Sequence, residues 1–81
     1  MKETKMTLLG FYQGKSKKTG KDFYMVYFYA KSEIGIGYQP YSFFIDYKDL
    51  QFFKAEDILK EFIVSHVFAG GQNIFISCKK S

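Results

Sequence analysis

A lysine-rich polar segment between two strand-like segments most constrains the fold of this chain. Residues 14–21 (GKSKKTGK) contain two glycines and four lysines, and they separate residues 6–13 from residues 22–31. Both flanking segments are rich in the large and aromatic residues that favour strands, and Gly10 in the first marks a bend or bulge. A short polar loop with glycine between two such segments is typical of a β-hairpin. The sequence therefore predicts two antiparallel neighbouring strands joined by a mobile cationic loop.

The second of these strands, residues 22–31 (DFYMVYFYAK), has aromatic or apolar side chains on both faces. Because side chains alternate along a strand, Lys21 and Lys31 lie on the same side as Tyr27 and Tyr29. We therefore assign Tyr27, Tyr29 and Lys31 to the outer face. The opposite face, expected in the core, carries Tyr24, Val26, Phe28 and Ala30. A register shift of one residue would exchange the two faces, because both are apolar.

A third strand is predicted over residues 41–47 (YSFFIDY), beginning at an edge near Pro40. Its side chains alternate, and the expected core face carries Tyr41, Phe43, Ile45 and Tyr47. Phe44 then lies between two polar residues on the opposite, solvent-facing side. An isolated ring in that position is expected of a binding surface more than of a core.

The rest of the chain adds a helix and a hairpin. Residues 55–62 have the apolar spacing of one short helix. Residues 63–68 and 73–79 form a closing hairpin across a glycine-containing turn. Residues 1–5 are polar and are expected to fray.

This order of elements indicates an all-β fold in a single domain, residues 1–81. Three strands, one short helix and two more strands form the pattern of the OB-fold, a five-stranded Greek-key barrel with a helix between strands three and four. An SH3-like barrel is the main alternative, but it lacks a helix of that length at that position. We therefore expect an OB-type barrel.

Aromatic content and charge distribution indicate a polyanionic partner. The chain has ten Phe, seven Tyr and no Trp, more rings than the core of one small domain needs. The formal net charge is +4, and all of the excess positive charge lies in residues 1–33. Lysines attract phosphates and exposed rings stack on unpaired bases, so the combination is typical of single-strand binding. All cationic side chains are lysine, which suits phosphates better than base edges, so binding is expected to be indifferent to sequence.

Few residues are available for catalysis or metal binding. The chain has one cysteine, Cys78, and one histidine, His66, so neither a disulfide framework nor a Cys/His zinc site is expected. We interpret Cys78 as a small apolar side chain, His66 as a buried strand residue, and the acids from Asp46 to Glu61 as a solvated face. The paired glycines match no phosphate-binding loop. No enzyme activity, cofactor or metal is expected.

The sequence also bears on location. No apolar segment is long enough to cross a membrane, and the first residues lack the apolar core of a signal peptide. We therefore expect no membrane partner and a cytoplasmic location, which would be the host cytoplasm for a viral protein.

The segment from Gly10 to Tyr29 resembles a known family. It consists of a strand ending in Gln13-Gly14, a Ser/Lys/Gly hairpin and a Phe/Tyr-rich strand. This order is similar to the first hairpin of the small single-stranded DNA-binding proteins of filamentous phages and other mobile elements, which are OB-fold dimers that coat DNA without sequence preference. The resemblance implies a homodimer in which Tyr27, Tyr29 and Phe44 stack on bases. The implied backbone contacts are Lys15, Lys17, Lys18 and Lys21.

The resulting hypothesis is sequence-independent binding of single-stranded DNA during replication or transfer of a small genome, with Lys31 added to the loop lysines. Two alternatives stay open. A small β-barrel protein-interaction module of a phage or conjugative assembly would use its aromatic face to dock a partner. An RNA-binding barrel of the cold-shock type would prefer RNA, and the sequence does not separate it from a DNA-binding one.

Overall fold

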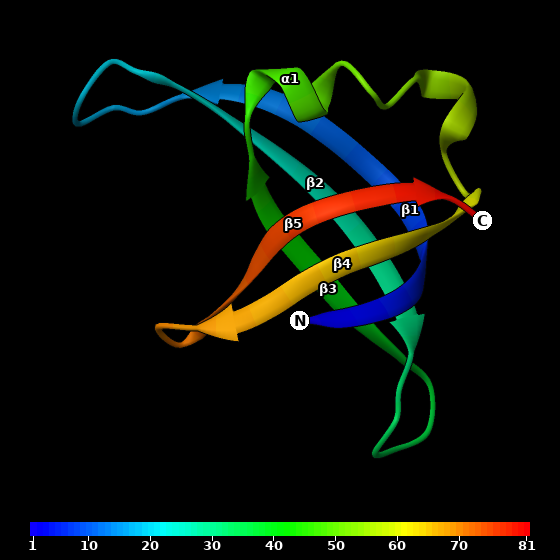
Figure 1. Ribbon diagram of the computed structural model, residues 1–81. Coiled ribbons are helices and arrows are strands. Elements are labelled where there is room, and N and C mark those ends of the chain that lie inside the picture. The colour runs from blue at the N-terminus through cyan, green and yellow to red at the C-terminus, as the bar shows by residue number, and fades with distance from the viewer.

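The computed structural model describes residues 1–81 as one antiparallel sheet of five strands with a single short α-helix (Figure 1). The elements in chain order are β1 (Lys2–Lys15), β2 (Asp22–Lys31), β3 (Tyr38–Ile45), α1 (Tyr47–Leu50), a 3-10 turn (Ala55–Asp57), β4 (Glu61–Ala69) and β5 (Gln72–Lys80). The strand order in the sheet is β3-β2-β1-β4-β5. The all-β class and the helix between the third and fourth strands are thus confirmed. No helix is long and apolar enough to cross a membrane.

The long strand β1 connects the two halves of the sheet. Its residues from Lys2 to Thr7 pair with β4, and its residues from Thr7 to Lys15 pair with β2. The register with β2 shifts between Leu8 and Gly10, which is the bulge that the glycine indicated. The expected fraying of residues 1–5 is wrong, because Lys2–Lys5 are hydrogen-bonded strand residues beside β4.

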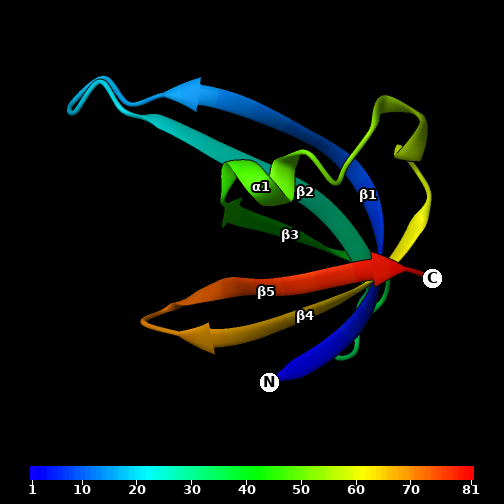
Figure 2. The same cartoon turned by 45° about the horizontal axis from the view of Figure 1, so that its top comes forward.

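The sheet curls until its two edge strands face each other, as Figure 2 shows from above. No ladder of hydrogen bonds joins β3 to β5. The rings of Phe43 on β3 and Phe75 on β5 nevertheless approach to 5.7 Å between centroids. The inner face of the curled sheet encloses a core of ten buried residues: Met6, Leu8, Val26, Phe28, Ala30, Phe43, Ile45, Phe53, Phe62 and Val64.

The assignment of faces on β2 and β3 is largely confirmed. Val26, Phe28 and Ala30 are buried, and Tyr24 packs half-buried against the core. Phe44 is 64% exposed on the outer side of β3. The assignment of Tyr47 to the core face is wrong, because β3 ends at Ile45 and Tyr47 is an exposed residue of α1.

The helix lies earlier in the chain than the sequence predicted. Within residues 55–62 only the 3-10 turn is helical, and Phe62 is a fully buried residue of β4. Leu59 has a φ of 70°, and its N–H donates to the carbonyl of Leu8 at 2.7 Å. The helical pattern of residues 55–62 is overridden because this segment hydrogen-bonds to β1 and buries Phe62 in the core.

One end of the sheet interior is closed by an apolar plug. Phe53, between α1 and the 3-10 turn, is 5% exposed. Its ring lies 6.0 Å from that of Phe11, 5.9 Å from Phe28 and 5.6 Å from Phe62. The connection from β3 to β4 therefore caps the core at the upper end of the molecule in Figure 1.

Candidate nucleic-acid interface

The β1–β2 hairpin presents its lysines from a hydrogen-bonded turn. The N–H of Ser16 donates to the carbonyl of Lys21, and the N–H of Gly20 donates to that of Ser16, both at 2.8 Å. Gly20 adopts a φ of 72°, a left-handed conformation that glycine reaches without steric cost. The four lysines of this loop, Lys15, Lys17, Lys18 and Lys21, are all exposed. The ion pairs of the structure involve only Lys2 and Lys80, so the hairpin lysines are available to an external anion.

Beside this hairpin, the outer side of β1, β2 and β3 carries a cluster that we call the outer aromatic face. Its members are Tyr12, Phe23, Met25, Tyr27 and Phe44. The rings of Tyr12 and Tyr27 stack at 5.6 Å between centroids with an angle of 19°. Phe23 meets Tyr12 edge-on at 5.9 Å and Phe44 at 6.2 Å, and the hydroxyl of Tyr12 donates to the sulfur of Met25 at 3.3 Å. Three strands thus contribute to one continuous surface.

The lysine hairpin and the outer aromatic face meet at Gly14. This residue pairs with Phe23, and Lys15 pairs with Asp22 one position further along. A Cβ atom at Gly14 would lie 2.5 Å from Cζ of the Phe23 ring, so the ring occupies the space that the absent side chain leaves. The glycine therefore positions an aromatic ring directly beside the first cationic residue of the turn.

The predicted site residues fall into two groups. Tyr27 and Phe44 belong to the outer aromatic face, next to the hairpin lysines. Tyr29 is also on the outer side, but its ring packs edge-on against Tyr38 at 5.2 Å. Lys31 is exposed at the end of β2, near the β2–β3 connection and away from the hairpin. In Figure 1 that connection lies at the lower right, opposite the β1–β2 hairpin.

Four contributors to the outer surface were missed by the sequence reasoning: Tyr12, Phe23, Met25 and Tyr38. Phe23 and Met25 alternate with Tyr27, so the period of two on β2 already carried the signal. Tyr12 carried no such signal. Strict alternation from the buried Met6 and Leu8 would put Tyr12 inside, and only the bulge before Gly10 turns it outward.

A groove extends the outer aromatic face toward the β4–β5 hairpin. It has a volume of about 340 Å³. Met25, Ser42 and Phe44 line one side, and Gln72, Asn73 and Ile74 line the other. The tips of the β1–β2 and β4–β5 hairpins lie on the same side of the molecule in both views, with the end of β3 between them (Figures 1 and 2). An extended ligand lying across the outer aromatic face would therefore be flanked by both hairpins.

Tyr27 of this surface stays protonated near neutral pH. The pKa of Tyr27 is raised above its usual value of 10.0, chiefly by a hydrogen bond with Tyr12, and burial adds to the effect. A neutral phenol does not repel phosphate. The surface thus combines uncharged rings with cationic side chains at its margin.

His66 and Cys78 have the structural roles that the sequence indicated. His66 is 3% exposed, and its Nε2 lies 2.9 Å from the hydroxyl oxygen of Thr4. Burial lowers the pKa of His66 below 6.5, the Asn73 amide opposes this change, and the charge of Lys2 adds to it. Burial also raises the pKa of the Cys78 thiol to about 11, so the thiol is protonated and a poor nucleophile at neutral pH.

The interpretation of the acids as a solvated face is wrong for Asp57. Its side chain is 1% exposed, and one oxygen, Oδ2, accepts a hydrogen bond from the N–H of Lys54 at 3.1 Å. The other oxygen, Oδ1, lies 3.5 Å from Nζ of Lys80 and has no hydrogen-bond partner. No group of three or more His, Cys, Asp or Glu side chains is placed to hold a metal ion.

Comparison of this chain with protein-family models, with characterised proteins and with solved structures finds no match.

Proposed function

We propose that this protein binds single-stranded DNA without sequence preference, with lysines on phosphates and outer aromatic rings on bases. One observation carries the proposal: the unpaired lysines of the β1–β2 hairpin adjoin a surface of mutually packed, partly exposed rings. Stacking on such rings is worth about 1–3 kcal/mol per base and tolerates any base. Single-strand binding of this kind would serve replication or transfer of a small genome.

We further propose that the curled sheet is an OB-type Greek-key barrel whose seam lies between β3 and β5. The strand order β3-β2-β1-β4-β5 supports this, because pairing of its two ends would close the sheet in the OB order. The contact between Phe43 and Phe75 and the apolar plug between β3 and β4 support it as well. In OB-folds the face of strands two and three and the loops that flank it bind single strands.

The test is a titration of intrinsic tyrosine fluorescence with oligo-dT at low and moderate salt. The chain has no Trp, so tyrosine dominates the emission. The wild type is compared with the double variant Tyr27→Ala/Phe44→Ala, and Tyr47→Ala serves as a matched control because Tyr47 is exposed on α1. We expect saturable quenching that weakens with salt and is largely lost in the double variant but retained in the control.

Absence of quenching and of binding by folded wild-type protein would overturn the proposal. The same titration with oligo-U separates DNA from RNA. Tighter binding of oligo-U than of oligo-dT would make the protein an RNA-binding one with the same contact surface.

The second candidate is a protein-interaction module of a phage or mobile-element assembly. Ile34 and Ile36 in the β2–β3 connection favour it, because they are 96% and 107% exposed and nothing in the chain covers them. A module of this kind would bind DNA weakly, through charge alone, and the Tyr27→Ala/Phe44→Ala variant would bind as the wild type does.

We also propose a homodimer. The edge strand β5 supports this, since its outer residues Ile74 and Ile76 are 40% and 49% exposed. Two linked subunits would bind one DNA strand more tightly, because binding of the first raises the effective concentration of the second at that strand. Sedimentation equilibrium of the wild type and of Ile76→Lys tests the proposal, and a monomer at all concentrations would contradict it.

A further inference from the structure

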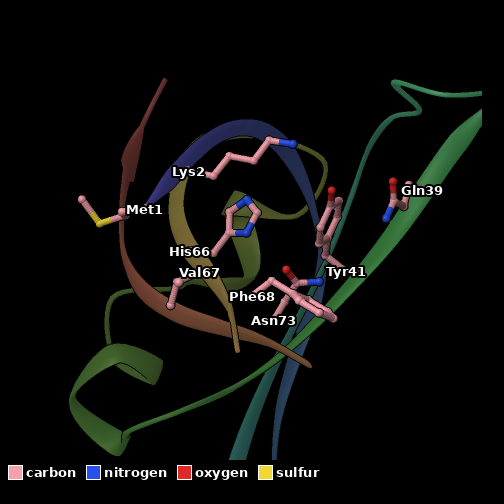
Figure 3. A pocket seen from close by; sticks show the side chains of 8 residues that line it. All are labelled: Met1, Lys2, Gln39, Tyr41, His66, Val67, Phe68 and Asn73. Carbon is pink, nitrogen blue, oxygen red and sulfur yellow. The ribbon is translucent and has the colours of Figure 1, made fainter. Parts of the chain in front are cut away.

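A second cavity opens into the interior of the curled sheet, at the end that the plug formed by Phe53 leaves uncovered. Its volume is about 470 Å³, within the range of about 300–1,000 Å³ that small-molecule sites occupy. Figure 3 shows it from close by, with side chains from the starts of β1 and β3 and from the β4–β5 hairpin around it. The cavity is separate from the lysine hairpin and from the outer aromatic face.

Neutral hydrogen-bonding groups line this cavity. Gln39 and Asn73 contribute amides, each with donors and an acceptor, and the His66 ring stands in the middle of the view in Figure 3. The Thr4 hydroxyl holds Nε2 of this ring at 2.9 Å, so the ring has a fixed orientation. Burial keeps the imidazole largely uncharged near pH 7, because it lowers the pKa of His66.

The remaining walls suit a flat ring. Tyr41 and Phe68 provide aromatic surfaces, and Phe68 is 69% exposed at the rim. Lys2 has the one charged side chain of the lining, and its ammonium group is already 3.1 Å from a carboxylate oxygen of Glu33. A cavity with two amides, an imidazole and aromatic walls but no carboxylate matches the edge and the faces of a nucleobase.

The position of the cavity connects it to the outer surface. Asn73 lines both this cavity and the groove that extends the outer aromatic face past Phe44. The strand between the two sites is β3, an edge strand whose free side has no ladder of hydrogen bonds to β5. A nucleic-acid strand lying over Phe44 would thus be separated from the cavity by the side chain of Asn73.

We propose that this cavity receives one base of the bound strand and reads its edge through Gln39 and Asn73. The inference rests on the proposed function, and it adds a single selective position to binding that is otherwise indifferent to sequence. Both amides offer a donor and an acceptor side by side, as the edge of a base requires.

The first test uses His66, the only histidine of the chain, as a probe in the cavity wall. The imidazole proton resonances are followed by NMR while oligo-dT, oligo-dC and oligo-dA of equal length are added, and tyrosine quenching is recorded on the same samples. We expect at least one oligonucleotide to shift the His66 signals with the same saturation as the quenching. Quenching with unmoved His66 signals for all three would overturn the base cavity and leave the proposed function intact. If none of the oligonucleotides binds or quenches the tyrosine fluorescence, both the base cavity and the proposed function are overturned.

The second test compares variants of the two amides with a neighbour. Gln39→Ala and Asn73→Ala change the cavity, whereas Gln72→Ala changes only the outer groove on the same hairpin. We expect each cavity variant to lower the affinity for the preferred homopolymer by about three- to tenfold, the effect of one lost hydrogen bond. The affinity for the least preferred homopolymer stays within twofold, and Gln72→Ala keeps the preference of the wild type. Equal affinity of the wild type for all homopolymers, or a preference that both cavity variants retain, would contradict the proposal.

Discussion

The inner and outer surfaces of β2 both carry aromatic rings, yet the rings differ in burial. Inside, Phe28 touches Phe43, Phe53 and Phe62, and all four are at most 5% exposed. Outside, every ring of the outer aromatic face keeps contact with solvent. Ring-to-ring distances around Phe28 and within the outer aromatic face are similar, between 5.6 and 6.2 Å. Packing between rings is therefore common to both surfaces, and burial is what separates a core from a candidate binding surface.

The largest effect is expected from breaking the inner cluster. Phe28→Ala removes a fully buried ring and should lower the free energy of unfolding by about 3–5 kcal/mol. Phe44→Ala removes an exposed ring and should lower it by less than about 1 kcal/mol. Urea denaturation followed by circular dichroism measures both. Equal losses would mean that the outer ring is as important to the fold as the inner one.

The same Phe44→Ala variant, which should have little effect on stability, should have a large effect on DNA binding. Loss of one stacking ring is worth about 1–3 kcal/mol, so the Kd for oligo-dT should rise about five-fold or more. Fluorescence anisotropy of a labelled oligonucleotide gives the value. Ile36→Ala, which removes an exposed apolar side chain from the β2–β3 connection, is the control and should bind as the wild type does.

A smaller effect is expected at Gly14, where the outer aromatic face meets the lysine hairpin. Gly14→Ala places a Cβ atom 2.5 Å from the Phe23 ring and should displace that ring. We expect a loss of about 1 kcal/mol in stability, as overpacking typically causes, with weaker binding of oligo-dT. Gly10→Ala is the matched control, since a Cβ there meets nothing within 4 Å. Equal stability and equal oligo-dT affinity of the two variants would show that Gly14 does not position the Phe23 ring.

The smallest effect concerns the one histidine of the chain, His66, which lies on the inner side. The pKa of His66 is lowered in the folded chain, so the unfolded chain binds a proton first as pH falls. The contribution to stability is complete above the unfolded pKa of about 6.5 and is lost as pH falls below it toward the folded value. Denaturation midpoints between pH 8 and pH 5.5 should decline for the wild type and decline less for His66→Gln. Identical pH profiles would show that another group titrates.

The local sequence was sufficient to predict which side chains face the core where a strand alternates regularly. The period of two correctly divided β2 and put Phe44 outside on β3, and the two hairpins followed from glycine-containing turns between apolar segments. These features depend on neighbours in the chain. The turn chemistry and the alternation are therefore visible without knowledge of the tertiary structure.

Long-range contacts decided what the sequence did not predict. Residues 2–5 look polar, but they are held by pairing with β4, more than fifty residues away in the chain. Residues 55–62 look helical, but Leu59 bonds to the backbone of Leu8 and Phe62 is needed in the core. Tyr12 lies in the candidate site because a bulge in β1 turns its side chain outward, and regular alternation does not predict a bulge. Asp57 is buried under Lys80, a partner from the last strand, β5.

The double pairing of β1 has a consequence for how the chain folds. The β1–β2 and β4–β5 hairpins each join residues that are close in sequence, so they can form early and independently. Pairing of β1 with β4 must instead close a loop that runs from Met6 to Phe62. Loop closure over such a length slows folding, because its entropic cost precedes any gain from contacts. We therefore expect the ladder between the start of β1 and β4 to be the rate-limiting assembly, and the first residues of the chain to be the last to acquire protection from hydrogen exchange.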